Sequence, residues 1–143
     1  MRDPSEPLEN AFMNKSLPII DESVALRQVL REIFVSRGCQ VLTAANHEEA
    51  IPHLRENSQI DLILLDLDYP LRDGKKVLQE LQNKTPGPKL LILSNIGAND
   101  DLELFYRQLE ALVLRKPFTI NELTDQAQTL LHNLPDGNSP ATH

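Results

Sequence analysis

The sequence of 143 residues has no tryptophan, a single cysteine and few aromatic residues of any kind. Because Cys39 has no second cysteine to pair with, an internal disulfide is excluded and a reducing compartment is expected. No segment approaches the roughly 20 consecutive apolar residues needed to span a bilayer, and residues 1–16 lack the apolar core of a secretory signal. We therefore expect a cytoplasmic protein with no membrane insertion.

Positive charge is also scarce, since 14 Lys and Arg residues face 21 Asp and Glu residues and the net charge is −7. Binding to a nucleic acid backbone requires a basic face, so direct nucleic acid binding is not expected. Hydrophobic residues make up 41% of the chain, which is enough for one domain with a sizeable core. Leu, Ile, Val and Ala must fill that core because aromatic residues contribute only 4%.

Strand and helix patterns alternate five times between two polar ends. We expect residues 1–16 and 135–143 to be disordered tails and residues 17–134 to form one domain. The expected strands cover residues 17–20, 40–44, 60–66, 89–93 and 112–114. An amphipathic helical pattern follows each strand. This alternation predicts an α/β fold with a doubly wound, five-stranded parallel sheet and helices on both faces.

Local signals mark where several helices begin and end. Gly38 follows the first helical pattern and is typical of a helix C-terminus. The segments 46–49 and 119–122 resemble capping boxes that open two further helices. Pro52 falls inside the second helical pattern, so we expect that helix to be irregular. Pro18 fits the first strand only at its very start, because proline cannot donate a ladder hydrogen bond.

Polar side chains follow four of the expected strands: Asp21-Glu22, Asp66, Ser94 and Lys116. Because parallel strands end at the same edge of a sheet, we expect these groups to share one rim. Three carboxylates there repel one another unless a cation lies among them, and Mg²⁺ prefers such oxygen ligands. A lysine and a hydroxyl supply what phosphoryl transfer requires, and a carboxylate can accept the phosphoryl group as an acyl phosphate.

In order and spacing, these residues resemble those of a response-regulator receiver domain, the CheY-like superfamily of two-component signalling. The resemblance covers roughly residues 17–132. The matching residues are Asp21-Glu22 with Arg27, Leu64-Leu65-Asp66 with Pro70 and Asp73-Gly74, Leu91-Ile92-Leu93-Ser94, and Lys116-Pro117-Phe118. The resemblance implies a flavodoxin-like strand order of 2-1-3-4-5.

The resemblance also implies a role for each residue at the rim. Asp66 is the expected phosphoacceptor, and Asp21 and Glu22 are expected to bind Mg²⁺ together with Asp66 and the backbone carbonyl of Asp68. Ser94 is expected to bind the phosphoryl group.

Lys116 is expected to pair with Asp66 or with the phosphoryl group, and Pro117 after it is usually cis in this family. No enzymatic activity is expected beyond self-phosphorylation and self-dephosphorylation at the aspartate.

The expected phosphodonor is a sensor histidine kinase or a histidine phosphotransfer protein. The chain is expected to be a stand-alone receiver or a fragment of a larger regulator, with no output unit such as a helix-turn-helix after residue 134. Its signal is then expected to reach a downstream protein through the fourth helix, fifth strand and fifth helix.

Five residues depart from the usual receiver pattern. Val113 stands where the family has Tyr or Phe as a rotating switch, and valine has neither a ring nor a polar tip. Leu109-Glu110 replaces the usual Gly-Ala pair, and Asn95 replaces a small residue after the hydroxyl position. Asp68 adds a negative charge near the acceptor. We therefore expect an intact acceptor site with an altered conformational readout.

Taken singly, each rim residue also has a plainer role. Asp21 or Ser23 can cap the first helix, Ser94 can be a turn residue, and Asp66 can be a buried structural acid. Lys116 alone is typical of a solvated surface. The same fold can also serve as a phosphorylation-independent pseudo-receiver that only binds proteins, as the departures at Val113 and its neighbours suggest.

A third interpretation is a phosphohydrolase of the haloacid-dehalogenase type. Asp66-Leu67-Asp68, Leu93-Ser94-Asn95 and Lys116 resemble its motifs, with Asp68 as general acid/base. The position of Asp66 in mid-chain and the lack of an acidic pair after Lys116 argue against it.

Overall fold

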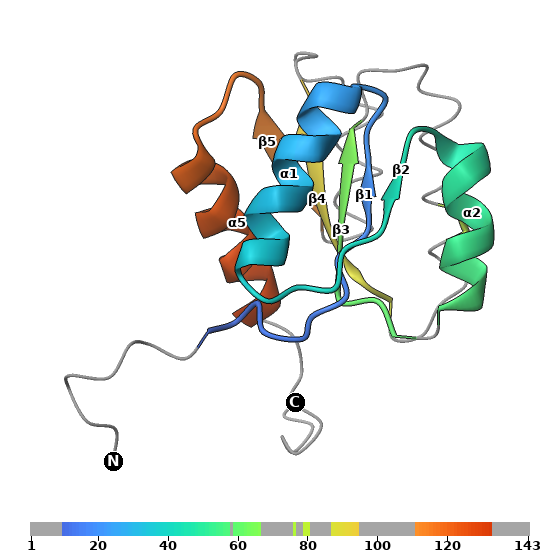
Figure 1. The fold of residues 1–143 in the computed structure, drawn as a ribbon, viewed down its shortest axis with the longest axis horizontal. Helices are drawn as coiled ribbons and strands as arrows, with labels where there is room; N and C mark the ends of the chain where they lie inside the picture. Colours follow the sequence, from blue (N-terminus) through green and yellow to red (C-terminus); the bar gives the residue numbers. More distant parts are fainter. Residues whose placement is uncertain are drawn as a thin grey trace.

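The structure is a computed structural model that describes residues 10–57, 59–66, 76, 79, 80, 87–94 and 111–132. The described strands and helices, labelled in Figure 1, are β1 (Ile19–Ile20), α1 (Val24–Ser36), β2 (Thr43–Ala44), α2 (His47–Glu56), β3 (Leu62–Asp66), β4 (Lys89–Ser94), β5 (Leu112–Arg115) and α5 (Ile120–His132). Most of the expected third helix, all of the fourth and both chain ends lie outside the described residues.

The five strands form one parallel sheet in the order β2-β1-β3-β4-β5, which confirms the predicted topology. Ile20 lies opposite Leu65, and Leu65 lies opposite Ile92 on the next strand. The carboxyl ends of the strands therefore align at one edge of the sheet, which is the upper edge in Figure 1.

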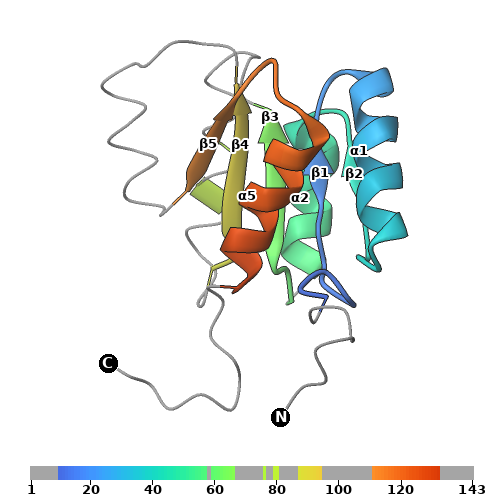
Figure 2. The same cartoon turned by 90° about the vertical axis from the view of Figure 1, so that its left-hand side faces the viewer.

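Alternation along the strands divides the core between the two faces of the sheet. Leu62 and Leu64 pack with α1 and α5 on one face, whereas Ile63 and Leu65 pack with α2 on the other. Figure 2 shows α5 and α2 on opposite sides of the sheet. Burial on both faces explains why β3 and β4 are continuous apolar runs. None of the described helices has the length and apolar character required to cross a membrane.

The predicted helix ends are confirmed in detail. The Gly38 and Cys39 amides donate to the carbonyls of Val35 and Phe34, and Gly38 has a φ of 98°, so α1 ends in a Schellman motif. The Glu49 amide donates to Asn46 Oδ1 at 2.9 Å. Likewise, the Glu122 amide donates to Thr119 Oγ1 at 3.0 Å. Both bonds satisfy donors at helix N-termini.

The two prolines have different outcomes. Pro18 directly precedes β1, and its carbonyl accepts from the Leu64 amide at 3.0 Å, as its expected place at the strand start allows. Pro52 lies within α2, which nevertheless continues from His47 to Glu56. Pro52 therefore does not interrupt α2, which is only ten residues long. The expected irregularity of this helix stays a prediction.

The boundary of the expected N-terminal tail at residue 16 requires correction. Residues 10–16 pack against the rest of the chain, and the Phe12 side chain is only 3% exposed. Phe12 belongs to the same core cluster as Phe34 and Leu17. The apolar run Ala11-Phe12-Met13 is too short to show a periodicity, so the burial of Phe12 could not be predicted from the pattern.

Truncation of Leu64 tests the two-sided core. Leu64 is fully buried, so Leu64→Ala is expected to lower the free energy of unfolding by about 2–5 kcal/mol. Val35→Ala removes apolar atoms from a side chain that is 44% exposed and should cost no more than about 0.5 kcal/mol. Urea denaturation followed by far-UV circular dichroism measures both values, and equal losses would contradict the assigned faces.

Candidate functional site

Four of the predicted site residues come together at the carboxyl edge of the sheet. Asp66 and Ser94 are the last residues of β3 and β4, and Asp21 and Lys116 directly follow β1 and β5. Backbone bonds fix their positions, since the Asp21 amide donates to Ala44 O at 3.0 Å and the Lys116 amide donates to Ser94 O at 2.9 Å. The strand ladders thus deliver two acids, a hydroxyl and an ammonium to one rim.

Asp66 and Lys116 form an ion pair across the end of the sheet. Lys116 Nζ lies 3.3 Å from Asp66 Oδ1, and the side chains are 23% and 10% exposed, respectively. At this partial burial the charge attraction is stronger than it would be in bulk water. The peptide bond from Lys116 to Pro117 is cis, as the resemblance implied. The structure therefore contains the expected pairing of Lys116 with Asp66.

Asp21 is the most buried acid of the site, with 1% of its surface exposed. Its Oδ1 accepts from the Ser23 amide at 2.8 Å, whereas Oδ2 is buried and has no hydrogen-bond partner among the described residues. Burial raises the pKa of Asp21 from 3.8 to about 6; the charge of Asp66 adds to the rise, and the Ser23 bond and Lys116 oppose it. A buried carboxylate oxygen without a partner is suited to bind a cation.

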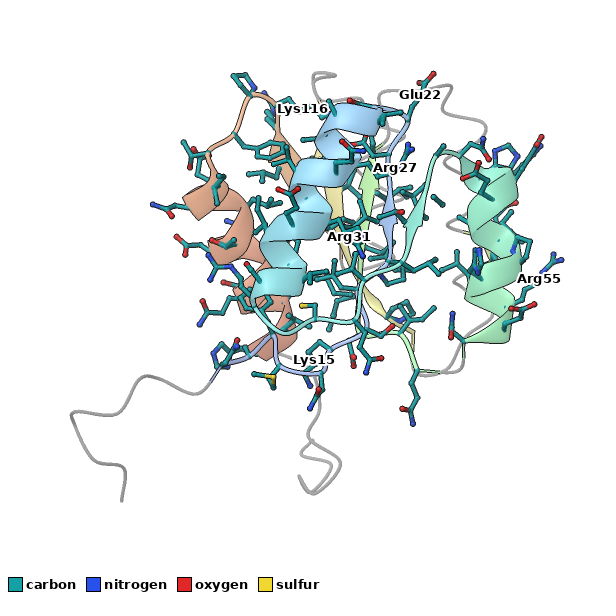
Figure 3. The ribbon with its side chains drawn as sticks, viewed as in Figure 1. Lys15, Glu22, Arg27, Arg31, Arg55 and Lys116 are labelled. Carbon is teal, nitrogen blue, oxygen red and sulfur yellow. The ribbon has the colours of Figure 1, made fainter. Side chains whose placement is uncertain are left out.

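Arg27 stabilises the loop that carries the acidic pair. Its Nη1 donates to the carbonyl of Asp21 at 2.7 Å and approaches that of Glu22 at 3.5 Å. Ser23 caps α1 by accepting from the Leu26 amide at 3.1 Å. In Figure 3, Arg27 extends from α1 toward β1 below this loop. The sequence pattern gave Arg27 no role, because these contacts depend on how the loop of Asp21 and Glu22 folds against α1.

Glu22 and Ser94 occupy contrasting environments. Ser94 is buried at the end of β4. Glu22 is exposed at the same end of the molecule as Lys116 (Figure 3). Within the part of the chain that the structure describes, no three acidic, histidine or cysteine side chains gather closely enough to enclose a metal. Asp68, predicted to contribute a carbonyl, lies outside the described residues.

The predicted departures can be located only in part. Val113 lies on β5 with 44% of its surface exposed, and it pairs with Ile92 across the ladder. Asn95 and Leu109-Glu110 lie outside the described residues.

Comparison with known proteins agrees with the geometry. Residues 17–128 match the family model described as the response regulator receiver domain. Over 121 residues the chain is 30% identical to the sporulation initiation phosphotransferase F of Bacillus subtilis, covering 84% of this chain and 96% of that protein. It is also 30% identical over 107 residues to a response regulator receiver protein of Anaeromyxobacter; that alignment includes 75% of this chain and only 44% of the relative.

Solved structures share the fold. The CheX–CheY–BeF₃–Mg complex of Borrelia burgdorferi has a chain that superposes with a TM-score of 0.71 at 24% identity, covering 82% of this chain and 90% of that one. The family match is to receiver domains, so the haloacid-dehalogenase interpretation is not supported.

The burial of Asp21 predicts a pH-dependent stability. With its folded pKa raised above the unfolded value of 3.8, the folded state binds more protons than the unfolded state between these values. Stability is therefore lost as the pH rises from about 4 to 6, and the full penalty remains above that range. In buffer without divalent cations, Asp21→Asn should raise the free energy of unfolding by about 2–3 kcal/mol at pH 7.5 and by less than about 1 kcal/mol at pH 4.

Urea titrations of both proteins at the two pH values measure these changes in the free energy of unfolding. Because the variant and the unmodified protein share all other titrating groups, the contributions of those groups cancel in the comparison. Equal effects at both pH values would show that Asp21 does not carry the charge penalty.

Proposed function

Because this chain belongs to the family of response regulator receiver domains, we propose that it accepts a phosphoryl group on Asp66 and signals by binding a partner protein. The observation that carries the proposal is the ion pair of 3.3 Å between Lys116 and Asp66, beside the buried Asp21 and Ser94. The donor is a phosphohistidine on a sensor kinase or a phosphotransfer protein. The compartment is the cytoplasm.

The chemistry assigned to these residues balances simply. A carboxylate oxygen of Asp66 attacks phosphorus while the N–P bond to the donor histidine breaks, and the electron pair stays on the imidazole. Lys116 neutralises charge that develops on the phosphoryl oxygens, and the Ser94 hydroxyl donates to one of them. Hydrolysis of the acyl phosphate by water returns the carboxylate and releases inorganic phosphate.

The residues at the rim suit Mg²⁺, a cation with a preference for oxygen ligands. Asp21 offers a buried carboxylate oxygen that has no hydrogen-bond partner among the described residues, and Asp66 is adjacent. Glu22 and the backbone carbonyl of Asp68 would complete the ligands. When bound, Mg²⁺ would offset the repulsion between these acids and the incoming phosphoryl group. The Borrelia CheX–CheY complex contains BeF₃ and Mg, which supports this assignment by analogy.

The proposed readout differs from that of a receiver with an aromatic switch. Val113 is exposed on β5 and is too small to swing between a buried and an exposed position as a ring does. Phosphorylation of Asp66 would still add negative charge next to Ser94 and Lys116. The resulting conformational change would have to reach a partner without an aromatic switch at position 113. A pseudo-receiver that binds partners without phosphorylation is the second candidate, and the substitution at Val113 favours it.

Labelling with a small phosphodonor tests the acceptor. Acetyl phosphate with Mg²⁺ is expected to add one phosphoryl group to the unmodified protein, and Asp66→Ala should abolish the addition. Asp125→Asn removes an exposed acid from the middle of α5 and should leave labelling unchanged. Intact-mass spectrometry measures the adduct. Failure of the unmodified protein to be labelled would contradict the proposal and favour the pseudo-receiver.

Thermal stability in the presence of Mg²⁺ tests the metal site independently of phosphorylation. Binding to the folded state alone should raise the unfolding temperature at pH 7.5, by an amount equivalent to about 2.7 kcal/mol at 100 times the dissociation constant. Asp21→Asn should abolish most of this rise, and NaCl of equal ionic strength controls for screening. Identical responses to MgCl₂ in both proteins would exclude Asp21 as a ligand.

A further inference from the structure

Residues 10–16 form a segment that we call the N-terminal strap. It lies outside the family match, which begins at residue 17. Figure 3 shows Lys15 of the strap at the end of the molecule opposite Lys116, so the strap is remote from the proposed acceptor site.

The strap contacts the C-terminal end of α1 through side chains. Asn10 Nδ2 donates to the Arg37 carbonyl at 2.7 Å, and Asn10 Oδ1 accepts from the Phe12 amide at 2.9 Å. The Phe12 ring lies 5.7 Å from that of Phe34 between centroids, and the Arg37 guanidinium lies 5.6 Å from the Phe12 centroid. The Phe12 side chain thus closes this end of the core.

Hydrogen bonds join the strap to the segment before β2 and to the start of β3. The Asn14 amide donates to Gly38 O at 2.9 Å, and the Gln40 amide donates to Lys15 O at 2.8 Å. At the end of the strap, the Ser16 amide donates to Asp61 Oδ2 at 2.8 Å. Ser16 also forms an isolated bridge with Gln40, but the strap is not part of any of the five strands.

Cys39 lies directly beneath the strap. Its side chain is buried, and Sγ donates to the Phe12 carbonyl at 3.4 Å. Burial raises the pKa of Cys39 to about 11, with a smaller contribution from Asp61, so the thiol is unreactive while it is covered. Because the chain has one cysteine, any thiol reaction reports on this position alone.

We propose that the N-terminal strap opens as a local unit while the sheet remains folded, and that opening uncovers the Cys39 thiol. In opening, the strap detaches from the end of α1, from residues 38–40 before β2, and from Asp61 and Leu62 at the start of β3. Three features make the strap a separate unit. Phe12 is the only buried residue of the strap, and the strap precedes every strand of the sheet. Leu17, which follows the strap, is fully buried and anchors β1. Segments with few buried apolar contacts at the edge of a fold open with a lower free energy than the core.

Thiol labelling of the unmodified protein tests the proposal. The rate of reaction of Cys39 with 5,5′-dithiobis(2-nitrobenzoate) in native buffer is compared with the rate calculated from global unfolding in urea. If the strap opens locally, labelling should be at least tenfold faster than the calculated rate. Low concentrations of urea should accelerate labelling only slightly, because opening of the strap exposes little surface. Labelling at the calculated rate, with the full urea dependence of unfolding, would overturn the proposal.

Two matched truncations locate the opening. Phe12→Ala should accelerate Cys39 labelling at least tenfold, because Phe12 is the anchor of the strap. Leu54→Ala, in the core cluster on the other face of the sheet, should lower global stability while leaving the labelling rate within about threefold. If Phe12→Ala does not fold, Asn10→Ala removes two strap hydrogen bonds at an exposed side chain and should accelerate labelling. The proposal would be overturned if the rate of Cys39 labelling rose in every variant in proportion to its loss of global stability.

Discussion

The parallel register of the strands is the constraint on which the rest of this structure depends. Asp66 occupies the last paired position of β3, opposite Leu93, and Ser94 is the last paired residue of β4. A slip of one residue would turn every side chain of a strand to the opposite face. Such a slip would separate Asp66 from Lys116 and place Leu64 and Leu65 on the wrong core clusters. The hydrophobic core and the chemical site are therefore specified by the same backbone pairing.

Much of this arrangement could be predicted because four of the five strands are short apolar runs with a polar residue at or just after their ends. The strand order and the convergence of Asp21, Asp66 and Lys116 agree with that pattern. The contacts of Arg27 and the burial of Phe12 could not be predicted in the same way, because each depends on how a loop folds back. Periodicity describes regular elements, whereas single residues in loops take their environment from tertiary contacts.

The charges at the rim have opposing effects on the ionisation of Asp21. Burying Asp21 opposes its ionisation, and the neighbouring Asp66 increases that cost, while Lys116 reduces it. Any added positive charge at the rim would relieve the repulsion, and any added negative charge would disturb the existing balance. The exposed Val113 lies on β5, and β4 separates it from the strand that carries Asp66.

Helix α1 joins the two ends of the molecule. Its N-terminus follows the loop of Asp21 and Glu22, and its C-terminus is held by Phe12 and Asn10. With 13 residues it extends about 20 Å. An affinity tag or fusion partner joined ahead of Asn10 would start from the end farthest from Lys116. Immobilisation through that end should consequently leave the rim that carries Asp66 and Lys116 facing the solution.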